Sequence, residues 1–332
     1  MSSVLVVGGA GYIGSHAAHA LRRRGYEPII YDNLSTGHAA LADGFELITG
    51  DMSDSARLLP VLHRVDAVMH FAALAYVGES VADPRKYFQN NVQSTLVLLN
   101  AVVDARVRRF VFSSTCAVYG MPEKIPITED TPRQPVNPYG ATKLAFENAL
   151  EAYSRAYGLQ YVSFRYFNAA GADQNGLVGE VHAPETHLIP SAFEAVKGER
   201  PALEVFGTDY PTPDGTCIRD YIHVDDLAEA HVLGIEHLEQ GGESVKLNLG
   251  TGHGHSVKEV VSTIESVTGK RVPQKMVARR PGDPVELVAD PSRAEKMLQW
   301  KAKRSLRQIV SSAWTWEQSS RRASLAAAAA DR

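Results

Sequence analysis

One stretch near the start of the chain sets the class of fold: Val4-Leu5-Val6-Val7-Gly8-Gly9-Ala10-Gly11-Tyr12-Ile13-Gly14. Val4 to Val7 is a short run of valine and leucine, typical of a strand buried on both faces of a parallel sheet. Gly8, Gly11 and Gly14 then fit a GxxGxxG pattern, and an alanine-rich segment through Arg24 predicts a helix. A glycine-rich turn without a ligand is the alternative. The strand before it and the helix after it favour a turn that brings backbone close to a pyrophosphate.

A second strand, Pro28 to Tyr31, ends at Asp32, about twenty residues past the last glycine, where an acidic side chain binds the adenosine ribose in such folds. A carboxylate at this position repels a 2'-phosphate. The pattern therefore predicts NAD rather than NADP. Asp51 follows the strand-like run from Glu46 and is either a contact to the adenine edge or an ordinary turn or cap acid.

Further strand-like runs alternate with helical segments, which predicts an α/β fold with a doubly wound parallel, Rossmann-type sheet and a smaller C-terminal substrate-binding lobe. We expect an NAD-binding domain at 1–168 plus roughly 216–250, with Ile218–Val224 and Val245–Gly250 returning to the main sheet. We expect a substrate lobe at 169–215 plus roughly 251–320, and a disordered tail at 321–332. The segment from Tyr87 to Ala105 has the apolar spacing of a helix.

The overall composition favours a small-molecule ligand. A net charge of -4 and a pI near 6.3 give no electrostatic case for nucleic acid or an anionic membrane. No apolar run approaches the roughly 20 residues that span a bilayer. Cys116 and Cys217 are too few for a disulfide framework or a thiolate zinc site, so we expect a cytoplasmic protein. Gly252-His253-Gly254-His255 is interpreted as a polar turn, and no metal is predicted.

The chemistry is expected between Ser113 and Lys143. Arg109 to Phe112 predicts a buried strand that ends in Ser113-Ser114-Thr115, at the sheet edge where ligands bind in open α/β folds, although such clusters commonly only cap helices. Tyr139 and Lys143 lie one helical turn apart, so the ammonium is expected to lower the pKa of the phenol and make it a base. A tyrosine–lysine pair alone also occurs by chance on solvated helices.

Several motifs together resemble those of the extended short-chain dehydrogenase/reductases, in particular the members that invert carbon 4 of UDP-sugars. The resemblance runs from Val4 to about Glu317 and rests on GGAGYIGSH, YDNLSTG, HFAA, NNV, FSST, NPYGATK, RYFNAAGA, DGTCIRDYIHVDDLA, NLGTG and RRPGD. It implies that Thr115, Tyr139 and Lys143 are catalytic. The sequence departs from the family at Ala75, where many members carry a lysine, and at His187, where many carry asparagine.

By this resemblance the cofactor-binding residues are expected to be Gly8, Gly11, Tyr12, Ile13, Gly14, Asp32, Asn33, Asp51, Met52, Phe71, Ala72, Ala73, Asn90, Ser113, Tyr139, Lys143 and Tyr166. The substrate-binding residues are expected to be Thr115, Tyr139, Asn168, His187, Leu188, Phe206, Arg219, Arg280, Asp283 and Leu287. The family also implies a homodimer that pairs the helices near Asn91–Ala105 and Tyr139–Tyr157.

The implied activity is reversible 4-epimerisation of UDP-glucose and UDP-galactose through a 4-keto intermediate, with tightly bound NAD as transient hydride acceptor. A 4,6-dehydratase of the family carries Asp-Glu after the catalytic Thr, and here those positions are Cys116 and Ala117. Epimerases for UDP-N-acetylhexosamines or UDP-pentoses remain alternatives, and the intermediate bulk of Leu287 predicts weak N-acetyl activity at most. A non-catalytic NAD-binding scaffold is the alternative from another class.

Overall fold

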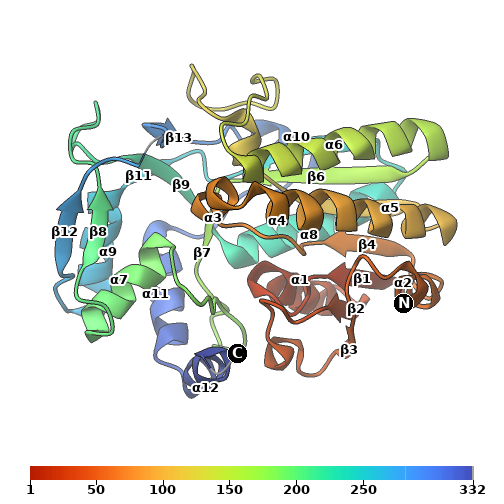
Figure 1. The fold of residues 1–332 in the computed structure, drawn as a ribbon, viewed down its shortest axis with the longest axis horizontal. Coiled ribbons are helices and arrows are strands. Elements are labelled where there is room, and N and C mark those ends of the chain that lie inside the picture. The colour runs from red at the N-terminus through yellow and green to blue at the C-terminus, as the bar shows by residue number, and fades with distance from the viewer. Residues whose placement is uncertain (281, 331–332) are drawn as a thin grey trace.

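Seven parallel strands form the central sheet of the computed structural model, which describes residues 1–280 and 282–330 (Figure 1). The strands are arranged in the order β10-β6-β5-β4-β1-β2-β3, and each neighbouring pair is parallel. They are β1 (Ser3–Val7), β2 (Glu27–Asp32), β3 (Glu46–Thr49), β4 (Ala67–His70), β5 (Arg109–Thr115), β6 (Gln160–Tyr166) and β10 (Val245–Leu249). Because β2 and β4 lie on opposite sides of β1, the crevice where ligands bind opens at the carboxyl end of β1.

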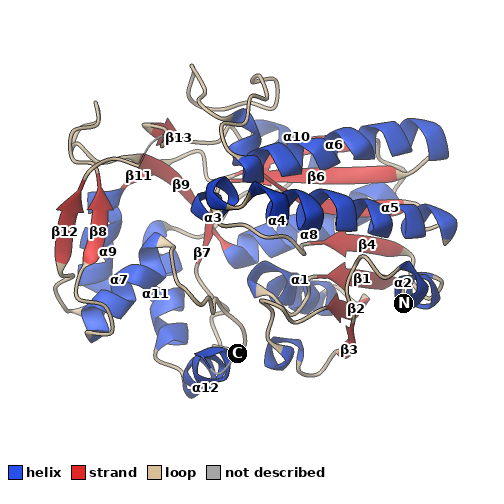
Figure 2. Ribbon diagram, in the orientation of Figure 1, coloured by secondary structure: helices blue, strands red, loops and turns tan. Residues whose placement is uncertain are grey.

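Helices cover both faces of this sheet (Figure 2). One face packs against α1 (Tyr12–Arg23) and α8 (Val224–Glu239), with Leu21, Leu227 and Ile235 buried among the strand residues. The other face packs against α2 (Ser55–Leu62), α5 (Thr95–Asp104) and α6 (Pro138–Tyr157). The short helices α3 (Val77–Ala82) and α4 (Pro84–Phe88) lie beside α6. The predicted doubly wound α/β sheet is confirmed.

A smaller lobe lies beside the sheet, to its left in Figure 1. Its four-stranded sheet contains β7, β9, β11 and β13, and a separate pair contains β8 and β12. These strands are β7 (Asn168–Ala170), β8 (Leu203–Phe206), β9 (Ile218–His223), β11 (Gly254–Ser256), β12 (Gln274–Val277) and β13 (Glu286–Leu287). Its helices are α7 (Leu188–Lys197), α9 (Val257–Thr268) and α11 (Leu306–Glu317), and α10 (Ser292–Leu298) contacts α8 and β10. The described residues include no helix with the length and apolar character needed to cross a bilayer.

Two expectations about the chain's path are wrong. The run from Ile218 to Val224 does not return to the main sheet, because β10 occupies the edge beside β6 and β9 pairs instead with β7, β11 and β13. The tail is not disordered over the described part of 321–332, since α12 (Ser320–Ala330) is helical and residues 331–332 lie outside the described residues. Alanine favours helix, and buried Leu325 packs beside Leu41 and Trp316.

Candidate active site

Glycines shape the turn between β1 and α1. Gly8 has a φ of +81°, and a Cβ there would lie 2.4 Å from the backbone nitrogen of Ala72. A Cβ on Gly14 would lie 2.2 Å from the carbonyl oxygen of Gly8. The backbone N–H groups of Phe71 and Ala72 donate to the carbonyl of Val7, which holds the segment after β4 against this turn. Neither glycine leaves room for a side chain, so the turn keeps the close packing that the pattern predicts.

The N-terminus of α1 is open to an anion. Its N-cap is Gly11, no side chain caps it, and its first turn contains no acidic residue. The N–H groups of a first helical turn have no partner within the helix and carry partial positive charge, so they attract phosphate. The cradle of small residues and the uncapped helix together fit the pyrophosphate of a dinucleotide.

Asp32 lies at the carboxyl end of β2, beside this turn. Its carboxylate accepts hydrogen bonds from the backbone nitrogens of Ala10 (3.0 Å) and Leu34 (2.8 Å). Burial raises the pKa of Asp32, while these two N–H donors oppose that shift. The group is held rigidly where an acid is needed to accept from a ribose hydroxyl.

The predicted adenine-side residues gather at the ends of β2 and β3. Asn33 donates to the Asp51 carboxylate at 2.8 Å, and the backbone nitrogen and hydroxyl of Ser53 donate to its other oxygen at 2.8 and 2.6 Å. Asp51 thus makes the contacts of a turn acid within the chain and lies beside Asn33. Met52 points into the core, where it is 6% exposed.

Thr115, Tyr139 and Lys143 meet at the carboxyl end of β5. Helix α6 begins at Pro138, and the side chain of its N-cap Asn137 accepts from Gly140. Lys143 Nζ donates to the carbonyl of Ser113 at 2.8 Å and lies 6.0 Å from the centroid of the Tyr139 ring. The Thr115 hydroxyl hydrogen-bonds the Tyr139 side chain. The sequence spacing therefore places a phenol, a hydroxyl and a lysine in one buried site.

The protonation of Tyr139 differs from the prediction. Burial raises its pKa above the usual range and the nearby Tyr166 adds to the rise, whereas the hydrogen bond from Thr115 opposes it. Burial also lowers the pKa of Lys143 to about 7, against the carboxylate of Glu147. In the chain alone the pKa of the phenol is therefore raised rather than lowered, because burial disfavours the phenolate.

Tyr166 and Asn90 border the same site. The hydroxyls of Tyr166 and Ser113 share a short hydrogen bond. Asn90 lies in a π-helical turn, η2 (Gln89–Ser94), between α4 and α5, so the segment predicted to be helical from Tyr87 to Ala105 is helical with a π-helical turn inside it. The turn lets Asn91 bond both the N–H and the carbonyl of Leu74 at 2.9 Å, a role that the sequence analysis missed. Its signal was the paired Asn90-Asn91 inside an apolar helix.

Two predicted cofactor contacts have side chains occupied elsewhere. The Tyr12 hydroxyl donates to the Gly171 carbonyl at 2.6 Å and so connects α1 to the lobe. Ile13 is partly buried against the core. Their backbone N–H groups still lie in the first turn of α1. Ala73 continues the segment that packs against Gly8.

The predicted substrate residues lie mainly along one side of the lobe. Arg219 on β9 pairs with Asp283, and the guanidinium of Arg280 lies 3.8 Å from the centroid of the Phe206 ring. Leu287 on β13 is the register partner of Arg219. Pro281, which follows Arg280 in the chain, lies outside the described residues. We call these residues the substrate group of the lobe: Phe206, Arg219, Arg280, Asp283 and Leu287.

Other predicted substrate residues have protein partners. Asn168 donates to the carbonyl of Asp220 at 3.1 Å. His187 contacts Glu180 and Glu185, and Leu188 starts α7 and packs on the lobe core. Arg279, the neighbour of Arg280 in the chain, contacts Asp209 at 2.7 Å and lies over the Tyr210 ring. The lobe therefore leaves Arg219 and Arg280 as the basic groups of the predicted substrate set.

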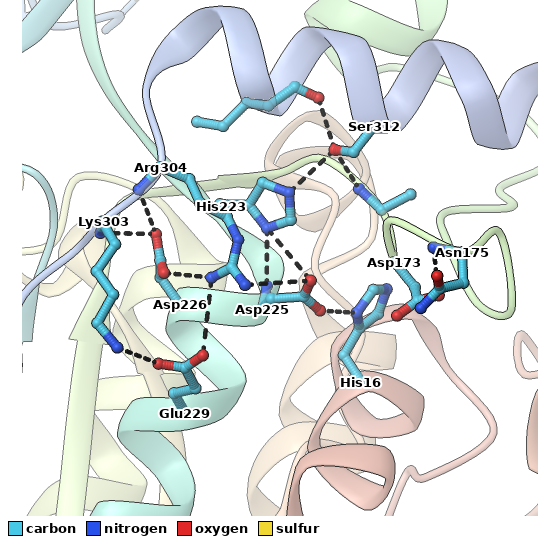
Figure 3. A network of polar contacts seen from close by, with 12 residues as sticks. His16, Asp173, Asn175, His223, Asp225, Asp226, Glu229, Lys303, Arg304 and Ser312 are labelled. Carbon is cyan, nitrogen blue, oxygen red and sulfur yellow. Dashed lines mark hydrogen bonds and ion pairs between the residues drawn. The ribbon is translucent and has the colours of Figure 1, made fainter.

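A buried polar network joins the lobe to α1 (Figure 3). His16 on α1 contacts Asp225 at 2.8 Å, and the Asp225 backbone nitrogen donates to His223 at 3.0 Å. His223 then contacts Ser312 on α11 at 2.9 Å. The sequence analysis missed this network, because its members are far apart in the chain and the segment IHVDDLA indicated only a strand and a helix.

The chain is similar to known proteins along nearly its whole length. The model of the NAD dependent epimerase/dehydratase family matches residues 4–250. A protein of Rhizobium meliloti (strain 1021) named UDP-glucose 4-epimerase is 51% identical over 317 residues, which cover 95% of this chain and 97% of that protein.

Two solved structures are similar over nearly their whole length. UDP-glucose 4-epimerase from Brucella ovis in complex with NAD is 52% identical with a TM-score of 0.93, covering 95% of this chain and 98% of the other. UDP-glucose-4-epimerase from Stenotrophomonas maltophila, with bound NAD and formylated UDP-arabinopyranose, is 40% identical with a TM-score of 0.94, covering 97% and 100%.

Proposed function

Because the chain belongs to the NAD dependent epimerase/dehydratase family, we propose that it interconverts UDP-glucose and UDP-galactose by inverting carbon 4 of the sugar, with NAD as cofactor. The observation that carries the proposal is the meeting of Thr115, Tyr139 and Lys143 beside the glycine turn. An oxidation and reduction at one carbon needs this combination of a base, a hydroxyl and a bound dinucleotide.

NAD, when bound, supplies the acceptor and donor of hydride and a positively charged ring in its oxidised form. The residues proposed to hold it are Gly8, Gly11 and Gly14 at the pyrophosphate, Asp32 at the ribose, and Asn33 and Asp51 near the adenine. Lys143 and Tyr166 are proposed to flank its other end. The backbone of the segment Phe71, Ala72 and Ala73 is proposed to pass close to the dinucleotide.

The chain's own residues handle the proton. Tyr139 takes the proton of the sugar 4-hydroxyl and returns it, and Thr115 holds the 4-oxygen at the hydroxyl of Tyr139. Burial alone keeps the phenol protonated, so its activation depends on positive charge in the closed site. Burial lowers the pKa of Lys143 to about 7, so in the chain alone this lysine is partly protonated near neutral pH.

Substrate is gripped away from the reacting carbon. We propose that Arg219 and Arg280 bind the diphosphate, with Asp283 orienting Arg219 and Phe206 lying beside the uracil. Asn168, His187, Leu188 and Leu287 are proposed to complete the sugar and nucleotide contacts. Strong binding of the nucleotide leaves the hexose free to turn and present either face, and no net oxidation results.

A dehydratase is disfavoured by the residues that follow Thr115. Such an enzyme needs an added acid and base, whereas Cys116 is buried and burial raises the pKa of its thiol to about 12. Ala117 has no ionisable group. The site thus provides one proton-transfer side chain at the sugar, which suits epimerisation.

The remaining expectations belong to the same proposal. We divide the chain into an NAD-binding domain, 1–168 with α8 and β10, and a UDP-sugar lobe formed by β9 and most of the rest. The free, buried Cys116 and Cys217 support a reducing, cytoplasmic compartment. A homodimer through α5 and α6 is supported by the family resemblance, and light scattering of the purified protein tests it.

The first experiment mixes the purified protein with UDP-galactose without added NAD and follows UDP-glucose. Conversion is expected, because a cofactor that is oxidised and reduced in each cycle needs no replacement. If no conversion occurs even with NAD supplied, UDP-pentoses and UDP-N-acetylhexosamines are tested next. If all of these fail, the non-catalytic scaffold is the better account.

A further inference from the structure

Four metal-ligating side chains converge in the loop between β7 and α7. They are Glu180, His182, Glu185 and His187, and one donor atom from each lies within 4.8 Å of the others. Glu180 and Glu185 are nearly buried, with side chains 10% and 4% exposed, while His187 is 48% exposed and reaches solvent. The group therefore differs from an exposed acidic patch, because its two carboxylates are nearly buried and only the imidazole of His187 is largely exposed to solvent.

The contacts within the group leave its hydrogen bonding incomplete. Nδ1 of His187 lies 2.7 Å from Glu180 and 3.2 Å from Glu185, so one nitrogen faces two carboxylates. Nδ1 of His182 lies 3.0 Å from the same Glu180 oxygen, yet it is buried and makes no hydrogen bond of acceptable geometry. A single N–H shared between two carboxylates bonds each of them more weakly, and a buried imidazole nitrogen without a partner is costly. A cation between the four donors would satisfy all of them.

The loop holds these ligands in place before any ion arrives. The Trp316 indole donates to the Glu180 carbonyl at 2.9 Å, and Arg200 donates to the Glu185 carbonyl at 2.9 Å. The Glu185 carboxylate accepts the N–H groups of Thr186 and His187, both at 2.7 Å. Such outer contacts orient ligating carboxylates in metal sites.

The donor set selects the class of ion. Two imidazole nitrogens and two carboxylate oxygens suit a four-coordinate Zn²⁺, whereas Mg²⁺ and Ca²⁺ prefer six or more oxygen ligands. We propose that Glu180, His182, Glu185 and His187 bind one Zn²⁺ ion. The ion takes no part in the sugar chemistry.

The position gives the ion a structural task. The ion would cross-link residues 180–187 of the loop that leads into α7. The centroid of the Tyr76 ring lies 5.8 Å from that of His182 and 6.3 Å from that of His187. Tyr76 belongs to the segment after β4, on the NAD-binding side. The ion therefore braces the lobe where it meets the cofactor domain and sets the orientation of His187, which precedes the predicted substrate residue Leu188.

The test measures metal in the NAD-loaded enzyme. The protein is dialysed against a chelator, then titrated with ZnCl₂ by calorimetry and, separately, with Co²⁺ while visible absorption is followed. We expect about one Zn²⁺ per chain with a dissociation constant below about 10 µM, and a Co²⁺ spectrum of the intensity given by four-coordinate sites. Zinc should also raise the thermal midpoint by about 5 °C at a hundredfold excess over its dissociation constant.

His182→Gln removes one ligand, and His253→Gln in the exposed turn before β11 is the matched control. Zinc should bind about 100-fold more weakly to the first variant and equally well to the second. Equal binding to wild type and His182→Gln overturns the site. If that variant does not fold, the wild-type titrations decide: no saturable Zn²⁺ binding and no such Co²⁺ spectrum mean that the cluster is an ion-pair network of protonated imidazoles. Neither result depends on epimerase activity.

Discussion

At the scale of single residues, burial shifts the pKa values of both Tyr139 and Lys143 towards their uncharged forms. It raises the pKa of the phenol and lowers that of the ammonium to about 7, so the chain alone keeps the phenol protonated and the lysine partly protonated near neutral pH. Ionising a buried group requires a compensating charge nearby. A positively charged ligand in the site would favour the phenolate of Tyr139, which otherwise stays protonated.

Tyr139→Phe should lower kcat by about 10²–10⁴-fold, because the proton acceptor is lost while the ring still fills its place. Bound NAD should remain. Tyr153→Phe is the control: this tyrosine lies on the same helix and its hydroxyl contacts only Asn100 among the described hydrogen bonds. The conversion of UDP-galactose is followed for both variants. Full activity of Tyr139→Phe would remove the phenol from its role as base.

Arg280→Gln should raise the KM for UDP-galactose by about tenfold or more and change kcat little, because its guanidinium is proposed to contact the diphosphate rather than the reacting carbon. The neighbouring Arg279 supplies the control, since it is bound to Asp209 and Tyr210. Steady-state kinetics of Arg279→Gln should match wild type. An equal rise in KM for both variants would contradict the assignment.

At the scale of elements, the site is made by strand ends and helix starts. β1, β2, β4 and β5 present their carboxyl ends at one edge of the sheet, where Gly8, Asp32, Phe71 and Thr115 follow or finish them. The first turns of α1 and α6 face the same edge. A parallel sheet brings these segments together whatever their separation in the chain. Local apolar spacing does not reveal the π-helical turn at Asn90.

Gly14→Ala should destabilise the protein by about 3 kcal/mol and reduce its NAD content, because the new methyl would meet the Gly8 carbonyl. Gly78→Ala is the control, since it sits in α3 and a Cβ added there would have nothing within 4 Å. The free energy of unfolding of that variant should lie within about 1 kcal/mol of the wild-type value. Urea unfolding and the nucleotide absorbance of the purified proteins measure both effects. A normal NAD content in Gly14→Ala would contradict the close packing of the turn.

At the scale of the whole molecule, buried polar groups join the two parts. The network from His16 through Asp225 and His223 to Ser312 links the cofactor helix to the lobe. Burial lowers the pKa values of several histidines: that of His70 to about 3, and those of His19, His223 and His231 to about 4, although Asp225 opposes the shift at His223. The folded protein therefore keeps these imidazoles neutral in weak acid.

These histidines predict acid lability. Their pKa values in the folded chain lie below the unfolded value of about 6.5, so the unfolded chain binds more protons and stability is lost as pH falls from about 6.5 towards 4. Each group contributes about 1.4 kcal/mol per pH unit in that window. His70→Phe should make the slope of unfolding free energy against pH shallower by that amount, and exposed His253→Gln should not. Denaturant titrations at several pH values measure the slopes, and an unchanged slope for His70→Phe would contradict the prediction.

Local pattern determined much of this protein. The short apolar runs predicted β1, β2 and β5 where the structure has them. The motif residues Gly8, Asp32, Thr115, Tyr139 and Lys143 come together in one region of the structure, because parallel topology follows from the alternation of strands and helices.

Only the tertiary structure decided the rest. β9 joined the lobe because β10 took the open edge beside β6, a competition between segments distant in the chain. The pKa of Tyr139 is raised because the phenol is buried, and local sequence does not record burial. The grouping of Glu180, His182, Glu185 and His187 also depends on how the loop folds back on Trp316 and Arg200. Sequence sets the elements and their motifs, whereas burial and long-range packing set their charges and partners.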